Sequence, residues 1–309
     1  MRRHAASVTI VPDAQGAAIA LGNFDGVHRG HQAVIASAMA HGDALGAPLG
    51  AAVFAPHPRR HFRPGDPPFQ IQTPAQRARA LAALGVRHLY EIAFNAETAA
   101  MTDEAFARGI LAGRLGVRHV SVGADFRFGQ GRMGDVARMR ELGAALGFSV
   151  DAVAPVTDGA ERYSSTAIRN AIVAGEMQRA ADRLSRPFAI EGVVQRGFQR
   201  GRGIGVPTAN LALGDYVRPR LGVYAVRVNL PDGSARAGVA SVGVNPTVGA
   251  LPEPVLEAHL FDFDGDLYGQ EIEAALIGFI RAEQKFESMD AMARQIENDM
   301  AAARTTLAG

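Results

Sequence analysis

Two histidines separated by three positions are the residues best suited to act on phosphate groups. His28 and His31 lie in residues 22–31, which follow a buried apolar run and lead into an amphipathic stretch. Residues three apart share a face once a helix has begun, and a helix start offers unpaired N–H groups to phosphate. Two imidazoles there can donate hydrogen bonds to phosphate oxygens as charge builds up in a transition state. A lone histidine is more often structural, but this pair after a glycine-bearing strand end indicates phosphate chemistry.

A second candidate site is the glycine- and arginine-rich segment of residues 196–210. A flexible basic loop can wrap around phosphates, and Thr208 and Asn210 offer two hard oxygens to Mg²⁺. On spacing alone, an ordinary solvated loop is the commoner interpretation. Glu257 lies on an alternating strand, where a glutamate usually just faces water.

The elements that must position the histidines alternate between strand and helix. Buried strands are expected at residues 17–21, 49–54, 88–93, 119–122 and 149–153, and helices at 31–45, 74–84, 103–115, 135–146, 166–174 and 177–184. This alternation predicts a doubly wound, Rossmann-like parallel sheet in which ligands bind beyond the carboxyl ends of the strands.

The pattern changes after residue 185. Strand-like runs at residues 188–194, 222–229, 238–244, 255–261 and 271–280 have turns but no long helix between them. They predict an antiparallel β-barrel, followed by a terminal helix at residues 289–304. The apolar stripe of that helix, formed by Met289, Met292, Ile296 and Met300, is expected to pack on the core. The fold class is therefore α/β plus a β-barrel, with domains at 1–185 and 186–309.

Composition narrows the classes of partner. The formal charge of +1 gives no general attraction to nucleic acids or anionic membranes. The chain has no cysteine, and no apolar run approaches the about 20 residues that span a bilayer. We expect a cytoplasmic protein without nucleic-acid or membrane partners, and the sequence is compatible with a homo-oligomer.

The segment Gly-Asn-Phe-Asp-Gly-Val-His-Arg-Gly-His resembles the His-x-Gly-His nucleotidyltransferases, in the version found in bacterial bifunctional riboflavin kinase/FAD synthetases. Further motifs of that family follow in order, although Ala55 and Ala124 stand where the family often has glutamate. The resemblance implies a nucleotide- and flavin-binding set in the first domain: Gly22, Asn23, Phe24, Asp25, Gly26, Phe54, His57, Pro58, Asp125, Phe128, Ser164, Ser165 and Thr166.

The same resemblance implies the reaction of the first domain, which is transfer of AMP from ATP to the phosphate of FMN. The products are FAD and pyrophosphate. His28, His31 and Arg169 are the residues expected to stabilise the charge on the phosphates, with Mg²⁺ assisting.

The second segment resembles the riboflavin kinase motif Gly-Arg-x-x-Gly-x-Pro-Thr-Ala-Asn, which reverses the solvated-loop interpretation. The residues carried over are Gly201, Arg202, Gly205, Pro207 and Asn245 for binding ATP and riboflavin, and Thr208 and Asn210 for Mg²⁺. By the same resemblance Glu257 is the general base that takes the proton of the riboflavin 5′-hydroxyl. Ala282 replaces a proline common in the family.

Parts of the sequence are also compatible with four other functions. Gly129, Gly131 and Gly134, with Asp151 beyond them, match a dinucleotide-binding pattern, but residues 125–128 separate the strand from the first glycine. Asp262, Asp264, Asp266 and Glu273 mimic an EF-hand with Leu267 where glycine is needed. The barrel could also be a non-catalytic flavin-binding module, against which Thr208, Asn210 and Glu257 argue. A nucleic-acid-binding barrel is disfavoured, because tryptophan is absent and Arg200 and Arg202 are too few to follow a phosphate backbone.

Overall fold

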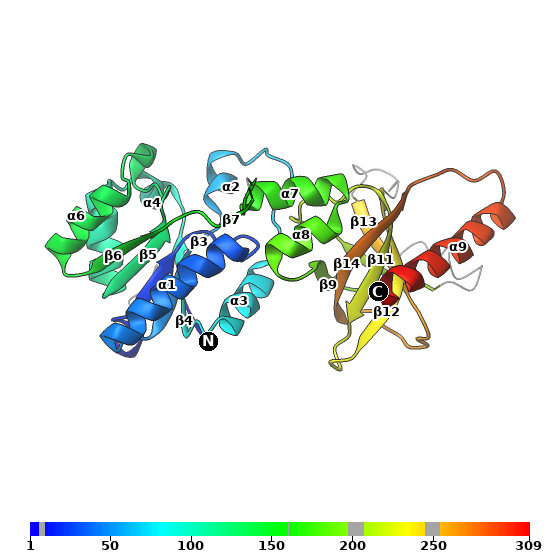
Figure 1. Cartoon of the computed structure of the whole chain (residues 1–309), viewed down its shortest axis with the longest axis horizontal. Coiled ribbons are helices and arrows are strands. Elements are labelled where there is room, and N and C mark those ends of the chain that lie inside the picture. Colours follow the sequence, from blue (N-terminus) through cyan, green and yellow to red (C-terminus); the bar gives the residue numbers. More distant parts are fainter. Residues whose placement is uncertain (6–9, 160, 197–206, 245–253) are drawn as a thin grey trace. The chain divides into compact units, whose positions relative to one another are not determined.

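The computed structural model describes residues 1–5, 10–159, 161–196, 207–244 and 254–309. Among the predicted site residues, Gly201, Arg202, Gly205 and Asn245 lie outside these ranges. The chain forms two compact units, one of residues 1–66 and 74–164 and the other of residues 67–73 and 165–309 (Figure 1).

The first unit is built on a parallel sheet in the order β1-β4-β3-β2-β5-β6. Its strands are β1 (Arg2–Ala5), β2 (Ala18–Leu21), β3 (Leu49–Ala55), β4 (His88–Ala93), β5 (His119–Gly123) and β6 (Ser149–Val153), and β7 (Thr157–Asp158) and β8 (Glu161–Arg162) form a separate hairpin. The predicted doubly wound sheet is confirmed. The sequence did not predict β1, a four-residue edge strand that pairs with β4 from Arg2↔His88.

Helices cover both faces of this sheet, as a doubly wound fold requires. They are α1 (Arg29–Leu45), α2 (Pro58–Phe62), α3 (Pro74–Ala83), α4 (Ala96–Ala100), α5 (Asp103–Phe106), the π-helical η2 (Ala107–Arg114), α6 (Val136–Leu146), and the 3-10 turns η1 (Pro12–Ala14) and η3 (Gln130–Arg132). Along β2, Ala20 packs in the core with α1 and α3, whereas Ile19 and Leu21 pack in the core with η2 and α6. The two apolar layers follow from side chains that alternate across a strand.

The strand order places a switch point between β2 and β5. From β2 the chain passes to β3 and β4 on one side, and then to β5 and β6 on the other. In such sheets a crevice opens beyond the carboxyl ends of the two strands at the switch. The histidine segment follows β2, and the loop with Asp125 and Phe128 follows β5, so both predicted segments emerge at this point.

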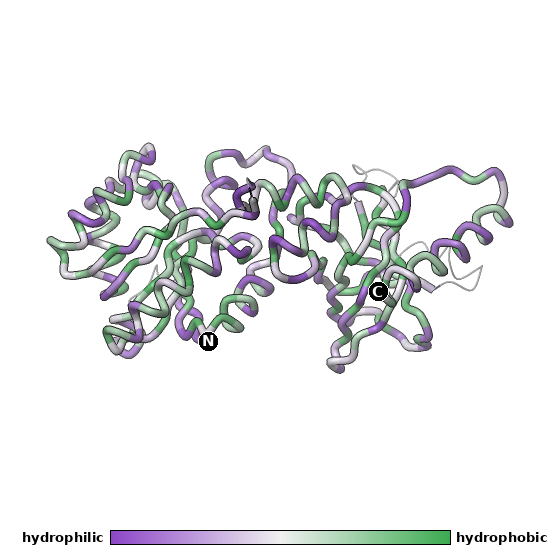
Figure 2. The backbone as a smooth tube through the Cα atoms, in the orientation of Figure 1, coloured by the Kyte–Doolittle hydropathy of each residue, from purple (hydrophilic) through white to green (hydrophobic). Residues whose placement is uncertain are grey.

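The second unit is a nearly closed antiparallel barrel in the order β10-β13-β12-β11-β14-β9, which confirms the predicted class. Its strands are β9 (Phe188–Val193), β10 (Ala209–Ala212), β11 (Gly222–Asn229), β12 (Ala235–Val244), β13 (Pro254–Leu260) and β14 (Glu271–Ala282). A bridge between Gln195 and Asn210 links the end of β9 to β10. Apolar residues, green in Figure 2, recur along the strands of both units.

This compact unit begins before the predicted boundary at residue 185. It takes in α7 (Ser165–Ala174), α8 (Met177–Leu184) and residues 67–73. The physical reason is a shared core, in which Ile168, Ile172 and Leu184 of the helices join Phe188 and Leu211 of the barrel. Position along the chain alone could not show this packing.

The terminal helix α9 (Met289–Ala308) lies on the outer face of the barrel. Ala303 is buried against Val223 and Val239, and Arg281 donates two hydrogen bonds, of 2.8 and 2.7 Å, to the buried Asp299. The predicted core stripe is corrected in part. Met300 packs on this small core, but Met289 in the first turn is 59% exposed.

Candidate functional site

His28 and His31 meet at the amino end of α1. His28 is the residue just before the helix, and its Nδ1 accepts a hydrogen bond from the backbone N–H of His31 at 3.3 Å. The two rings stack with their centroids 3.6 Å apart and their planes 19° from parallel. The predicted pair therefore shares one face at a helix start, where N–H groups and the helix dipole favour an anion.

The glycine inside the His-x-Gly-His motif has a geometric role. A Cβ atom at Gly30 would lie 3.1 Å from Cε1 and 3.2 Å from Nδ1 of His28, and 3.4 Å from the carbonyl of Tyr163. The missing side chain therefore leaves the space in which the His28 ring lies over the first turn. Even a methyl group there would push against the imidazole.

The loop before the helix has an unusual backbone. Phe24, Gly26 and Val27 have φ angles of 50°, 92° and 42°. For a β-branched residue such as Val27 this conformation is strained. Phe24 and Val27 are both almost fully buried, so packing holds the loop in place. Such strain concentrates at ligand sites.

Arg77 was not predicted as a site residue, but it reaches this loop from α3. Its side chain is buried, and its NH1 donates to the carbonyl of Asn23 at 3.3 Å. Burial lowers the pKa of Arg77, and the buried carboxylate of Asp25 partly opposes that shift. An arginine in an amphipathic helix ordinarily faces water, so no local signal revealed it.

Two polar atoms near this contact remain unsatisfied within the described part of the chain. They are the side-chain oxygen of Asn23 and Nε of Arg77, both buried. A buried polar atom without a partner is costly. A bound substrate that hydrogen-bonds to Asn23 would remove part of that cost.

Aromatic rings join two predicted binding residues from different strand ends. Phe54, at the end of β3, and Phe128, in the loop after β5, each lie 6.0 Å from the ring of Phe106. His57, also in the predicted set, caps α2 by accepting a hydrogen bond from the backbone of Arg59 at 3.1 Å. Pro58 is the first residue of that helix, where proline is well tolerated.

The β5 loop is held by ion pairs. Arg162 donates to Asp125 at 2.9 Å, and this bond is the main reason that the pKa of Asp125 lies below its usual value. Ser164 ends the first compact unit, whereas Ser165, Thr166 and Arg169 belong to α7 in the second. There the Nε of Arg169 donates to the carbonyl of Phe69 at 2.7 Å.

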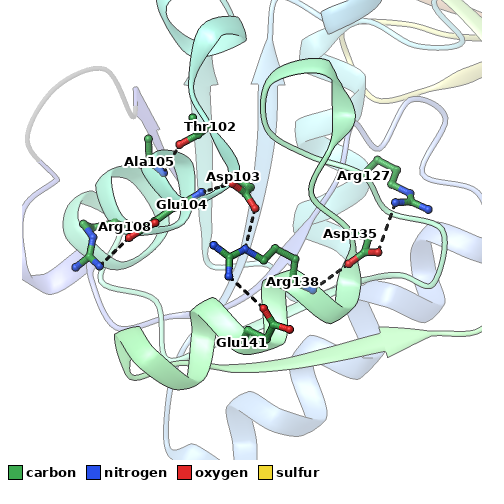
Figure 3. Close-up of polar contacts among 9 residues, drawn as sticks. All are labelled: Thr102, Asp103, Glu104, Ala105, Arg108, Arg127, Asp135, Arg138 and Glu141. Atoms are coloured by element: carbon green, nitrogen blue, oxygen red, sulfur yellow. Dashed lines mark hydrogen bonds and ion pairs between the residues drawn. The ribbon is translucent and has the colours of Figure 1, made fainter.

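Two of the three glycines of the dinucleotide-like pattern allow close packing in this loop. A Cβ atom at Gly129 would lie 2.7 Å from the backbone nitrogen of Asp103, and one at Gly134 would lie 2.7 Å from the ring of Phe128. Arg138 ties the same region together by pairing with Asp103 at 2.9 Å and Glu141 at 3.1 Å (Figure 3). The segment is therefore not the strand-to-helix turn that binds a dinucleotide.

On the barrel, two of the predicted kinase residues are paired across neighbouring strands. Asn210 of β10 is the register partner of Glu257 of β13, so their side chains share the outer face. The Nδ2 of Asn210 donates to the carbonyl of Thr208 at 3.3 Å, which leaves its Oδ1 oriented as an acceptor. Hydroxyl and amide oxygens are ligands suited to Mg²⁺, so the residues fit the predicted ion.

A cavity of about 580 Å³ opens beside Thr208, and its lining includes Ala209 and Ala258, the chain neighbours of Asn210 and Glu257. Pro207 and residues 263–268 also line it. His259 holds Pro207, one of the lining residues, because its Nδ1 donates a hydrogen bond to the Pro207 carbonyl at 2.9 Å. In the sequence, residues 262–273 only resembled an EF-hand loop. That aromatic and acidic residues among them line a cavity could not be predicted from the sequence.

The EF-hand interpretation finds no support in the geometry. The Oδ1 of Asp266 accepts the backbone N–H of Tyr268 at 2.9 Å, and Asp262 lies near Arg304 at 3.3 Å. Within the described ranges, no group of three or more acidic, histidine or cysteine side chains is arranged to hold a metal ion. In the same part of the chain, no helix is long and apolar enough to cross a bilayer.

Comparison with known proteins assigns both units. Residues 10–167 match the FAD synthetase family and residues 184–307 the riboflavin kinase family. A bifunctional riboflavin kinase/FMN adenylyltransferase of Pseudomonas fluorescens is 40% identical over 96% of this chain and 95% of its own length. Proteins of the same name are 38% identical in Escherichia coli K12, over 94% and 92% of the two chains, and 35% in Bacillus subtilis, over 91% and 89%.

A solved structure from Streptococcus pneumoniae, named as a macrolide-efflux protein, shares the fold along the whole chain. It superposes with a TM-score of 0.87 at 30% identity and covers 98% of both chains. The sequence matches, which extend over both units in a single order, carry the assignment. The chain belongs to the bifunctional riboflavin kinase/FMN adenylyltransferase family.

Proposed function

We propose that this chain makes FMN in its barrel and FAD in its parallel-sheet unit, with the predicted residues in the roles given below. The observation that carries the proposal is the presence, in one chain, of the stacked His28–His31 pair and of the Asn210–Glu257 strand pair. Each pair belongs to the unit whose family performs the corresponding reaction.

In adenylyl transfer, a phosphate oxygen of FMN attacks the α-phosphorus of ATP. The bond to the bridging oxygen breaks, and pyrophosphate leaves with its electron pair. The attacking oxygen is already anionic, so the protein has to orient and stabilise charge rather than remove a proton. Because Nδ1 of His28 accepts a hydrogen bond, the neutral ring carries its proton on Nε2. That proton can be donated to a phosphate oxygen as negative charge develops.

Other predicted residues of this unit would contact the substrates. Phe54 and Phe128 would contact the flavin ring, and Asn23 the nucleotide. Ser164 would complete the phosphate contacts of this unit. Ser165, Thr166 and Arg169 belong to α7 of the other compact unit, and their role in phosphate binding stays a prediction from the family resemblance. Asp125 would help to hold the flavin-side loop through Arg162.

In the kinase reaction, the riboflavin 5′-hydroxyl attacks the γ-phosphorus of ATP and ADP leaves. Glu257 takes the hydroxyl proton as the new oxygen–phosphorus bond forms. Thr208 and Asn210 would hold Mg²⁺, which when bound neutralises charge on the ATP phosphates. The cavity walled by residues 263–268 is large enough for part of a nucleotide or a flavin.

The substrates are therefore riboflavin, FMN and ATP. We further propose a cytoplasmic location, no nucleic-acid or membrane partner, and compatibility with a homo-oligomer. The domain boundary at residue 185 likewise remains a proposal.

The decisive experiment incubates the purified protein with riboflavin, ATP and MgCl₂ and separates the flavins by chromatography. FMN should appear first and FAD later, and EDTA should suppress both. A second reaction that starts from FMN isolates the adenylyl transfer. Absence of both products would overturn the proposal, and FMN alone would leave only the kinase.

A further inference from the structure

A network of polar side chains lies between α1, β5 and β6 and reaches into the core from one edge. It consists of two residues from each element: Ser37 and His41, His119 and Ser121, Ser149 and Asp151. His119 and Ser121 are 1% and 0% exposed, whereas Ser37, His41 and Asp151 are half-buried and Ser149 is exposed. Polar groups in such a place need a reason, because each must find a partner to offset the loss of water.

In this network one side chain donates a hydrogen bond to the next, in a single series that ends at Asp151. Ser37 Oγ donates to Asp151 Oδ2 at 2.7 Å, so it accepts from Ser121 Oγ at 2.8 Å. Ser121 has then used its only proton and must accept from Nε2 of His119 at 2.9 Å. Nδ1 of His119 then accepts from Ser149 Oγ at 2.7 Å, a much shorter contact than the 3.5 Å between Ser149 Oγ and the carbonyl of Arg118. A neutral His119 with its proton on Nε2 is consistent with each of these hydrogen bonds.

The arrangement contains serine, histidine and aspartate, but it is not a nucleophilic site. Both ring nitrogens of His119 are occupied, and the ring is covered by His41, which stacks on it at 3.9 Å with an interplanar angle of 6°. Neither ring nitrogen of His119 is therefore available to act as a base on a substrate. The network therefore has a structural role in this unit rather than a direct contact with a ligand.

Two of the three elements that the network joins lead directly into the candidate site. α1 begins one residue after His28 and carries His31 in its first turn, whereas β5 ends at Gly123, just before the loop with Asp125 and Phe128. The apolar contacts of α1, through Val34, Ile35 and Ala38, are not directional, so they constrain its position along its axis less sharply than hydrogen bonds do. The hydrogen bonds of 2.7–2.9 Å in this network fix the distance and direction between the groups that they join.

We propose that Ser37, Ser121 and Asp151 are positioning residues for adenylyl transfer, which hold the amino end of α1 in register with the loop that follows β5. This inference rests on the proposed role of His28 and His31 and extends it to residues that touch no substrate. A displacement of about 1 Å at reacting groups can lower a rate by about a hundredfold.

The test compares Ser37→Ala with Leu115→Ala. Leu115 is fully buried in the same unit but lies beside the amino end of β5, away from the site. For both variants and the wild type, the melting temperature and the kcat and KM of FAD formation from FMN are measured below the transition. Riboflavin phosphorylation by the same chain reports on the second unit and should stay at the wild-type level.

We expect kcat of Ser37→Ala to be at least fivefold below that of Leu115→Ala, with KM values for ATP and FMN within threefold of wild type. A smaller difference in kcat would mean that the polar network only stabilises the fold, and would overturn the inference. If Ser37→Ala does not fold, Asp151→Asn is compared with Asp151→Ala. Asparagine keeps an acceptor for Ser37, so its kcat should be at least fivefold higher, and equal values would overturn the inference.

The proposed function can fail separately. If the wild type makes no FAD, or if His28→Ala makes it at the wild-type rate, the roles of the histidines are wrong. If wild type and His28→Ala behave as expected but Ser37→Ala matches its control, only the positioning role is wrong.

Discussion

The rings of His28 and His31 lie face to face, with their centroids 3.6 Å apart, at the first turn of α1. This stacking, together with the hydrogen bond from the His31 backbone to Nδ1 of His28, orients one imidazole by means of the other. The pair stands at the switch point between β2 and β5, so it is presented where a parallel sheet opens to a ligand.

Replacing His28 by alanine should selectively remove FAD formation. Loss of one preorganised donor to a developing charge typically lowers kcat by about 10²–10³-fold. The rate of FAD formation from FMN should fall by that order, and the rate of FMN formation from riboflavin should not change. Loss of both activities in a folded variant would contradict independent sites.

Replacing Gly30 by alanine should impair the same step without loss of stability. The new Cβ would lie 3.1 Å from the His28 ring and displace it, whereas alanine by itself favours a helix by up to about 1 kcal/mol. We expect a fall in kcat for FAD formation of about tenfold and an unchanged melting temperature. Gly109→Ala, at a helical glycine with no neighbouring atom within 4 Å, is the matched control and should keep full activity.

Arg77 should affect both the stability of the first unit and its affinity for substrate. Arg77→Ala removes a buried cation that contacts Asn23 and faces Asp25, at a cost of about 3 kcal/mol. Chemical denaturation would measure that loss, and the KM for ATP should rise because the residue 22–26 loop is held less firmly. Arg87→Ala, on the exposed surface, should change the unfolding free energy by less than about 0.5 kcal/mol. Equal effects of the two substitutions would refute the role of Arg77.

Glu257→Gln should remove the kinase activity and spare the adenylyl transfer. Glutamine keeps the shape of the side chain but cannot accept the hydroxyl proton, which typically costs about 10²–10⁴-fold in rate. FMN formation is measured from riboflavin, and FAD formation from added FMN. Glu271→Gln, at an exposed position on β14, should retain both activities. Wild-type FMN formation by Glu257→Gln would show that another group is the base.

His119 should make the free energy of unfolding of the first unit depend on pH. Burial, followed by the nearby His41 on α1, lowers the pKa of His119 to about 4, while Asp151 on β6 opposes the shift. The folded state therefore keeps His119 neutral between pH 6.5 and 4, whereas the unfolded chain takes up a proton. Stability is fully present above pH 6.5 and decreases as the pH falls toward 4, by at most about 3 kcal/mol.

Urea denaturation of wild type and His119→Gln at several pH values measures this effect. The free energy of unfolding of the variant should fall less steeply between pH 6.5 and 4. Parallel slopes for the two proteins would rule out His119 as the titrating group.

The sequence by itself determined the fold class and the segments that carry the chemistry. Most strands and helices lie within a few residues of their expected ranges, because the period of apolar residues is a local property of the chain. His28, His31, Thr208 and Asn210 were predicted from contiguous motifs, whose members lie close together through local geometry, and their roles stay predictions.

Only the tertiary structure decided the features that depend on contacts between distant segments. The edge strand β1 was missed because it is short and mostly exposed, so it has no apolar pattern. The grouping of α7 and α8 with the barrel, and the exposure of Met289, depend on which surfaces meet.

The same reason applies to the site. Arg77 reaches Asn23 across 54 positions, and Ser37 reaches Asp151 across 114. A serine or an arginine in an amphipathic helix looks locally like a solvent-facing residue. It becomes part of a site only when the packing of helix on sheet removes water and brings distant polar groups together.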